Sequence, residues 1–566
     1  MTTVRGRLPA TTVELAVLVS GVSSMGLEIL AGRMVAPVFG SSIYTWGSII
    51  GVFLAALSLG YHRGGRRAAD ANRRNLGTLL LGSAAYVAFV ILASEAVLQQ
   101  ALLLPVPPRF ASILPVTILF GPPVYWLGYI SPYAAELSGK SGIGEASGHV
   151  YALGTVGSIV GAFATTFVLV PSLQVAYIGL LFGVLQLGAA GSVLAPSIPR
   201  RSIVGVVLVG VLLIGAVVGA TAGTTYRGDV VYRTQTPYQS LAVVDDDGVR
   251  TLYLGGQRHS AMALGAPDDH VFTYTRYFHL PMLMQDDVDR VLFIGGGGFT
   301  GPKAFAARYD VTVDVVEIDP EVVRTAKEYF HVEERPDLRI HVMDGRQFLR
   351  ETNRTYDVIV LDAYRPTKVP FHLTTVEFMH LAASRLDGDG ALVANVIAAP
   401  TGPASRFLRA EYRTMERAFP HVYSFRTAPT GGVQNVELVA SKDDRLFTKG
   451  ELHRRNERRD IGIDLDRAID FYRRDLRTGD VPVLRDDRAP VDRLLDPVLG
   501  GQYVVEPVDE ETAGNGTNAT GRLRTGTEDD VTSDRTAGPG SPAEDRASRP
   551  AGAHPPAATG RVTAGG

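Results

Sequence analysis

Three acidic residues stand at the ends of successive apolar runs in the second half of the chain. Glu317 ends "VDVVEID", Asp344 follows "RIHVM", and Asp362 ends "DVIVLD". Carboxylates at such positions can bind the hydroxyls of a ribose or the amino group of an adenine, or accept a proton from a nucleophile. Each acid alone could instead be a helix N-cap or a turn residue. Together they predict an adenosine site, with Glu317 serving only the ribose and Asp362 as the catalytic carboxylate.

A glycine-rich turn, "RVLFIGGGGFTGPKAF", precedes these acids. Its residues 296–301 match the pattern G-x-G-x-x-G, and Glu317 follows Gly296 by 21 positions. Glycines allow a tight turn and let a ligand approach the backbone closely. Alone, the pattern fits NAD as well as ligands of the S-adenosylmethionine type. The residues predicted to bind the nucleoside are Gly295, Gly296, Gly297, Gly298, Glu317, Asp344 and Gly345.

The elements that position these residues follow from the hydrophobic pattern, in which apolar runs alternate with helical segments from residue 291 on. Such alternation predicts an α/β domain with a doubly wound, Rossmann-like parallel sheet. Before it, segment 238–257 has two short strands around Asp-Asp-Gly, which indicates a small β-hairpin subdomain. The predicted strands are 291–295, 313–319, 339–343, 357–362 and 391–397, and the predicted helices are 302–309, 320–329, 345–352 and 374–386.

The first part of the chain is mostly apolar and predicts a multi-pass α-helical membrane domain. Three parts are expected: a transmembrane domain at 1–222, the Rossmann-like domain at 223–505, and a disordered polar tail at 506–566. The tail has few large apolar residues, so it cannot build a core. About seven spans are predicted, near 13–35, 42–62, 76–97, 111–134, 149–170, 174–195 and 202–222.

Composition excludes several kinds of site. The chain has no cysteine, so disulfides, cysteine nucleophiles and cysteine-ligated metal centres are excluded. We predict no metal site. A formal net charge of −3 gives no indication of nucleic-acid binding.

Several short motifs resemble one known family, the polyamine aminopropyltransferases or spermidine synthases. The stretch 230–400 carries the resemblance in detail, and "GGQRHSAM" and "LRDDRAPVDRLL" resemble its membrane-fused branch. The motifs are "TPYQ", "FHLP", "VLFIGGGG", "VVEIDPEVV", "MDGRQFL" and "YDVIVLDAYRP".

The resemblance implies transfer of an aminopropyl group from decarboxylated S-adenosylmethionine, as co-substrate, to an amine. It implies that Gln239 and Glu317 hold the thioadenosine, that Asp344 meets the adenine, and that Asp362 helps to deprotonate the attacking amine. No tightly bound cofactor is expected. The expected partners are the lipid bilayer, a small-molecule amine and a second copy of the chain in a homodimer.

The sequence departs from the family where carboxylates normally bind the amine. Gly298 replaces the aspartate of the Gly-Gly-Gly-Asp loop, and Arg365 replaces the second carboxylate of the D-S-x-D motif. Tyr274 and Thr275 replace a His-Glu pair. Tyr274 and Arg365 are therefore candidate substrate-binding residues in an altered amine site.

Other functions stay open at this point. A methyltransferase could use intact S-adenosylmethionine and pair its carboxylate with Arg365, and the domain could also sense nucleosides without catalysis. An NAD oxidoreductase lacks an obvious catalytic Tyr-x-x-x-Lys set.

The side of the membrane is a separate prediction. Loop 63–74 carries five arginines, which favours the cytoplasm. Seven crossings would then place the α/β domain outside, whereas sulfonium nucleosides are cytosolic metabolites. We predict a cytoplasmic α/β domain and one span too many in the count, in 76–107 or 202–222. Pro and Gly in 121–132 could also mark a broken helix.

Overall fold

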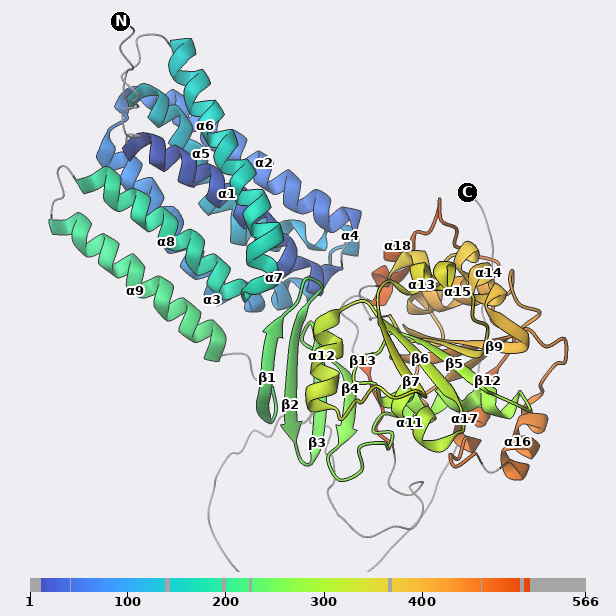
Figure 1. Ribbon diagram of the computed structural model, residues 1–566. Helices are drawn as coiled ribbons and strands as arrows, with labels where there is room; N and C mark the ends of the chain where they lie inside the picture. The colour runs from blue at the N-terminus through green and yellow to red at the C-terminus, as the bar shows by residue number, and fades with distance from the viewer. Residues whose placement is uncertain are drawn as a thin grey trace, which may run out of the picture. The chain divides into compact units, whose positions relative to one another are not determined.

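The computed structural model describes most of the chain up to Val508, and Figure 1 shows apolar helices followed by an α/β domain. The polar tail predicted from the sequence lies outside the described residues from position 509 on. The described residues are 12–40, 42–137, 143–195, 200–222, 226–364, 369–459, 461–498 and 503–508.

Within these ranges, seven helices are long and apolar enough to cross a membrane, as the sequence predicts. α6 continues through a π-helical segment, Thr165–Leu169, into the short α7 (Val170–Ser172), and the short α4 (Pro108–Ala111) precedes α5. The seven are α1 (Thr12–Phe39), α2 (Ile43–Arg66), α3 (Arg73–Leu102), α5 (Ile113–Leu137), α6 (Ile143–Ala164), α8 (Val175–Leu194) and α9 (Arg200–Ala222).

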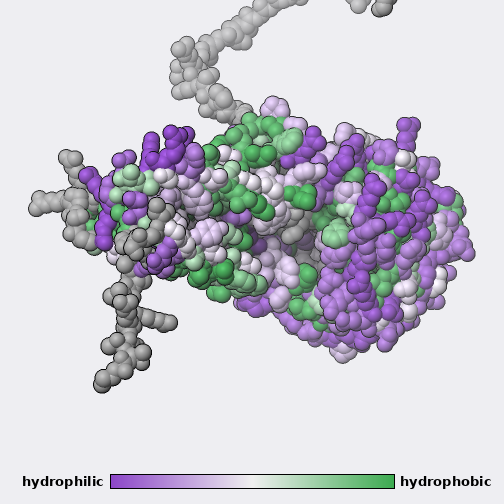
Figure 2. Space-filling model, turned by 90° about the horizontal axis from the view of Figure 1, so that it is seen from above, coloured by the Kyte–Doolittle hydropathy of each residue, from purple (hydrophilic) through white to green (hydrophobic). Residues whose placement is uncertain are grey.

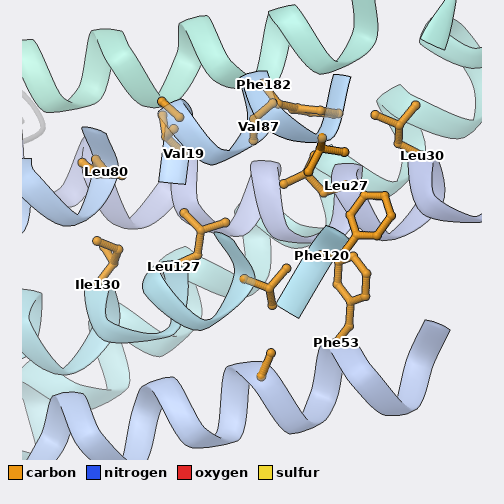
Figure 3. Close-up of a cluster of buried hydrophobic side chains, with 14 of the residues drawn as sticks. Val19, Leu27, Leu30, Phe53, Leu80, Val87, Phe120, Leu127, Ile130 and Phe182 are labelled. Carbon is orange, nitrogen blue, oxygen red and sulfur yellow. The ribbon is translucent and has the colours of Figure 1, made fainter. Parts of the chain in front are cut away.

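The apolar helices share one hydrophobic core (Figure 3). Phe53 of α2 and Phe120 of α5 are fully buried, with ring centroids 5.7 Å apart. Other apolar side chains point outward, among them Val204, Val207 and Val211 of α9. Figure 2 shows hydrophilic side chains over much of the α/β domain instead. Exposed apolar faces on helices of this length suit contact with lipid.

Pro and Gly do not break the fourth span, contrary to the sequence-based suggestion. α5 is one helix from Ile113 to Leu137 and contains Pro122, Pro123 and Pro132. Proline has no amide hydrogen, so Pro122 leaves the carbonyl of Ile118 without its usual helical donor. The hydroxyl of Tyr86, on α3, donates to that carbonyl at 2.7 Å. A neighbouring helix therefore supplies the missing hydrogen bond, which is how prolines are tolerated inside spans.

The α/β domain is built on a mixed sheet rather than the all-parallel sheet predicted. The strand order is β12-β10-β11-β9-β8-β5-β6-β7, and β13 pairs with β11. From β9 to β7 all neighbours are parallel, whereas β11 is antiparallel to β9 and β10. The strands are β5 (Arg290–Ile294), β6 (Thr312–Glu317), β7 (Leu338–Val342), β8 (Tyr356–Leu361), β9 (Leu386–Ala398), β10 (His421–Arg426), β11 (Val433–Ser441), β12 (Tyr472–Arg473) and β13 (Tyr503–Val504).

Helices cover the sheet, and an apolar core lies on each of its faces. One core contains Phe293 and Phe425, and the other contains Leu292 and Ile359. A short helix α10 (Thr273–Arg276) and a 3-10 helix η4 (Tyr277–Leu283) belong to the first core. The longer helices are α11 (Thr300–Arg308), α12 (Pro320–Tyr329), α13 (Gly345–Glu351), α14 (Val376–Ser384), α15 (Arg406–Met415), α16 (Lys449–Arg458), α17 (Asp466–Asp470) and α18 (Val491–Leu495).

A separate four-stranded antiparallel sheet precedes the mixed sheet, with the order β1-β2-β3-β4. The two strands predicted around Asp-Asp-Gly are β2 and β3, which pair with each other. Asp247 and Gly248 have φ values of 46° and 76°, as a tight hairpin turn requires. The sheet is thus larger than the predicted hairpin. Its strands are β1 (Asp229–Gln235), β2 (Ser240–Asp246), β3 (Val249–Leu254) and β4 (Gln257–Ala263).

Candidate functional site

The predicted nucleoside residues meet at the carboxyl edge of the parallel strands. β5 lies between β6 and β8, so the strand order reverses there, and in open α/β sheets ligands bind outside such a switch point. Glu317 ends β6, and Asp362 follows β8. The amide of Gly295 donates to Val316 O of β6, and the amide of Asp362 donates to Ile294 O of β5. These bonds hold the ends of three strands together.

Gly295 is required by its backbone. Its φ is +101°, and a Cβ there would lie 2.3 Å from the carbonyl oxygen of Asp362. A side chain would therefore be strained and would clash with the strand that carries the predicted base. The sequence explains this glycine by the close approach of a ligand. The structure adds a second reason, which is the close approach of the protein's own backbone.

Gly298 lies against the small sheet. A Cβ on Gly298 would be 2.8 Å from Cβ of Ser260 and 3.3 Å from Cδ1 of Phe330. The amide of Gly298 donates to Oγ of Ser260 at 2.9 Å. Ser260 belongs to β4 and to the segment "GGQRHSAM". In this protein a serine therefore occupies the space next to position 298.

Glu317 is buried, with 9% of its surface exposed, and its carboxylate binds the protein's own backbone. Its Oε2 accepts from the amide of Gly296 and its Oε1 from the amide of Asp319, both at 2.9 Å. Burial raises the pKa of Glu317, and these backbone hydrogen bonds oppose the rise. The expectation that its carboxylate serves only the ribose is wrong, because it also fixes the glycine turn.

Asp344 has the helix N-cap role that the sequence left open, and its adenine-binding role stays a prediction. Its Oδ1 accepts from the amide of Gln347 at 2.9 Å, which makes it the N-cap of α13. Its Oδ2 lies 2.9 Å from Nε2 of His372. The adjacent Gly345 packs against β5, because a Cβ there would be 2.3 Å from Cγ2 of Ile294. The cap fixes the carboxylate at the same sheet edge as Glu317.

The loop before β2 holds Gln239. The amide of Gln239 donates to Oγ1 of Thr236 at 3.0 Å, and the amide of Thr236 donates to Gln239 O at 2.8 Å. Next to it, Tyr238 has a raised pKa, mainly through burial and further through the nearby charges of Asp319, Glu317 and Asp344. The loop is therefore close to the acids of β6 and β7, as a thioadenosine site needs.

Asp362 lies at the end of β8 and is partly exposed. Its Oδ1 accepts from Nδ2 of Asn395, on β9, at 2.8 Å. Burial raises the pKa of Asp362 to about 6, Glu317 adds to the rise, and the Asn395 hydrogen bond opposes it. A carboxylate with such a pKa is ionised near neutral pH and still basic enough to take a proton from an amine.

Of the two residues predicted to bind the substrate, the structure describes Tyr274 but not Arg365. Tyr274, on α10, is buried, and its hydroxyl donates to His259 O at 3.0 Å. Burial raises its pKa well above the usual range, and the charge of Asp362 contributes. Tyr274 thus lies within range of the charge of Asp362, and its role in substrate binding stays a prediction. Arg365 lies outside the described residues.

Sequence reasoning missed several polar residues that surround Asp362. Asn395 and Asn435 are joined by a hydrogen bond of 2.8 Å, and Tyr503 donates to Asn435 at 2.8 Å. Glu437 lies on the same strand as Asn435 and is fully buried. The sequence did contain an indication of these residues, because three polar residues interrupt the apolar run "VQNVELVAS". Among the described residues, no group of three or more His, Asp or Glu could hold a metal ion.

Comparison with known proteins agrees with the geometry. Residues 272–433 match the family described as the spermine/spermidine synthase domain. A polyamine aminopropyltransferase of Vibrio vulnificus is 30% identical over 212 residues, which are 36% of this chain and 69% of that protein. One from Moorella thermoacetica is 29% identical over 227 residues, 38% of this chain and 77% of that protein. A probable spermidine synthase of Corynebacterium glutamicum, seen by crystallography, shares 24% identity, covers 41% of this chain and 88% of its own, and gives a TM-score of 0.36.

The chain belongs to the polyamine aminopropyltransferase family. It is therefore a transferase, and the family predicted from the sequence motifs is confirmed. The family's co-substrate is decarboxylated S-adenosylmethionine, which agrees with the co-substrate expected from the resemblance.

Proposed function

We propose that this protein is a membrane-anchored enzyme that transfers an aminopropyl group from decarboxylated S-adenosylmethionine to a small amine. The observation that carries the proposal is the meeting of Glu317 and Asp362 with the glycine turn at one sheet edge. Gln239, Glu317, Asp344, Gly345 and the turn Gly295–Gly298 hold the thioadenosine in this proposal.

The chemistry that the proposal assigns to the site is a displacement at carbon. The lone pair of the neutral amine attacks the methylene carbon bound to the sulfonium, and the carbon–sulfur bond breaks with its electron pair going to sulfur. Methylthioadenosine leaves, and the new ammonium group gives its proton to Asp362 and then to solvent. The pKa of about 6 at Asp362 suits this role.

The test uses the full chain in detergent with a panel of amines and mass spectrometry of the products. We expect methylthioadenosine and an aminopropylated amine from decarboxylated S-adenosylmethionine. Methylated product from intact S-adenosylmethionine, or a rise in melting temperature with NAD alone, would overturn the proposal.

Seven apolar helices could cross a membrane, and we propose that six of them do so, with the α/β domain in the cytoplasm, where the sulfonium donor is made. Loop 63–74, with its five arginines, would lie on the same side. Five of the seven helices follow this loop, so the proposal requires that one of the five does not cross. In bacterial cells, a green fluorescent protein fused after Val508 should fluoresce, whereas activity of alkaline phosphatase fused there would refute this placement.

The homodimer stays a prediction from the sequence. Light scattering on the detergent-solubilised chain measures it, and a single-chain mass would contradict it.

A further inference from the structure

The polar residues beneath Asp362 form a connected layer on one face of the sheet. Asn395 donates to Asp362, Asn435 donates to Asn395, and Tyr503 donates to Asn435, each at 2.8 Å. Glu437 lies directly opposite Asn395 in the pairing of β9 and β11. Residues two apart on a strand share a face, so Glu437 and Asn435 lie on the same side as Asn395.

Glu437 is the one member of this layer whose carboxylate has no protein donor. It is 0% exposed, and neither oxygen accepts a hydrogen bond from any residue that the structure describes. The hydroxyl of Tyr277, on η4, is likewise buried without a partner among the described residues. A buried carboxylate without a partner is costly, and such a group requires a reason, for example a bound ion, an ordered water or a catalytic role.

Packing alone gives no reason for an acid at this position. On β10 the residue opposite Glu437 is Phe425, and Val439 follows on the same face. An apolar residue would fill this place without any desolvation cost. The charge of Asp362 lies near enough to raise the pKa of Glu437 further, after burial. Two acids that interact within a buried layer repel each other unless one is protonated or a cation neutralises them.

The loss of acids elsewhere indicates which cation that is. Position 298 is a glycine, and Ser260 occupies the space beside it. Position 365 is an arginine, which repels ammonium groups. We infer that Glu437 binds the positively charged amine of the acceptor and replaces, from β11, the carboxylates that this chain lacks. The inference rests on the proposed function and names the substrate class of the same site: amines without a carboxylate of their own.

The first test compares two isosteric variants of the full chain, E437Q and E411Q. Glu411 is also fully buried, but Tyr364 donates to its Oε1 at 3.0 Å, which makes it the matched control. We expect E437Q to raise the KM for 1,4-diaminobutane by about tenfold or more, because an ammonium–carboxylate hydrogen bond is lost. The KM for decarboxylated S-adenosylmethionine should not change, and E411Q should change neither value. An unchanged acceptor KM in E437Q would overturn the inference.

A second readout separates ligand binding from structural support. Removing a buried carboxyl group that has no donor among the described residues should raise the melting temperature of E437Q, whereas removal of a structural partner would lower it. A lower melting temperature together with equal losses for donor and acceptor would show that Glu437 only supports the fold.

The inference stays testable if the wild-type chain makes no product, an outcome that would refute the proposed function alone. The melting temperature is then measured with methylthioadenosine and increasing 1,4-diaminobutane, n-butylamine or 4-aminobutyrate. A rise with the first two amines that is lost in E437Q supports the acceptor site. No rise with any of them in the wild-type chain, or a rise that E437Q keeps, refutes it.

Discussion

Replacement of Asp362 by Asn tests the centre of the proposed mechanism with almost no change in volume. The pKa of Asp362 is about 6 in the folded protein, against about 3.9 for an ordinary aspartate. The folded state therefore holds the proton more tightly than the unfolded state, so protonation of Asp362 favours folding at acid pH. That contribution is lost as pH rises through about 6. At pH 7 the difference of about two pKa units corresponds to about 3 kcal/mol.

Three measurements follow from these values. D362N should melt at a higher temperature than the wild-type chain near pH 7, and the difference should shrink towards pH 4, where the wild-type carboxyl is protonated. Its kcat should fall by about 10²- to 10⁴-fold, because the proton acceptor is lost. In the wild-type chain kcat/KM for the amine should rise through about pH 6, in addition to any rise at higher pH from the amine itself. The lower inflection should be absent in D362N.

The result that would refute this reasoning is specific. If D362N forms methylthioadenosine at the wild-type rate, Asp362 does not take the proton. If D362N is slow but also loses affinity for methylthioadenosine by calorimetry, its role is binding rather than proton transfer. A pH profile that is flat between pH 5 and pH 7 in the wild-type chain would contradict the raised pKa.

Three further substitutions test the parts around this centre. G298D introduces the acid that the family resemblance leads one to expect, but its Cβ would lie 2.8 Å from Cβ of Ser260. We therefore expect thermal unfolding to show a loss of about 1–3 kcal/mol in the free energy of unfolding, and kinetics to show no gain in amine affinity. A gain would contradict the packing argument. E317Q places an amide group against the backbone donors of Gly296 and Asp319. Calorimetry with methylthioadenosine should therefore show affinity reduced by about tenfold or more. Wild-type affinity in this variant would show that Glu317 does not belong to the site. Y86F leaves the carbonyl of Ile118 without its donor, which should cost about 1–3 kcal/mol in thermal unfolding in detergent, and no change would mean that another group satisfies this carbonyl.

The parallel part of the fold could be predicted closely from the sequence. The run predicted at 291–295 is β5, Arg290–Ile294, and the run at 357–362 is β8, Tyr356–Leu361. Both strands are covered on both faces, so their residues are almost continuously apolar and easy to recognise. The glycine turn and the acids at the strand ends were predictable for the same reason, because their positions follow from the ends of apolar runs.

The antiparallel strands β10 and β11 were not predicted, and their residues show why. β11 is buried along its whole length, yet Gln434, Asn435 and Glu437 interrupt its apolar pattern. A pattern search reads such an interruption as a loop or an exposed edge. Asn435 and Glu437 instead share the face of the sheet on which Asn395 binds Asp362, whereas the amide group of Gln434 binds the backbone of Ala428 and Thr430. Two of the three residues that concealed the strand therefore extend the layer beside Asp362.

This explains why a comparison of motifs alone finds too few carboxylates in the amine site. The motifs lie on the loops after β5 and β8, where the resemblance leads one to expect carboxylates at positions 298 and 365 and the chain has Gly298 and Arg365. The strand pairing places Glu437 opposite Asn395, and Asn395 binds Asp362. An acid far along the chain thus enters the neighbourhood of the predicted base through the sheet and not through a motif. Since Ser260 fills the space beside Gly298, an acid could not simply return there. In the proposed site, the negative charge for the acceptor amine therefore comes from another direction. Glu437 is an acid near Asp362, it is buried, and neither of its carboxylate oxygens has a partner among the described residues.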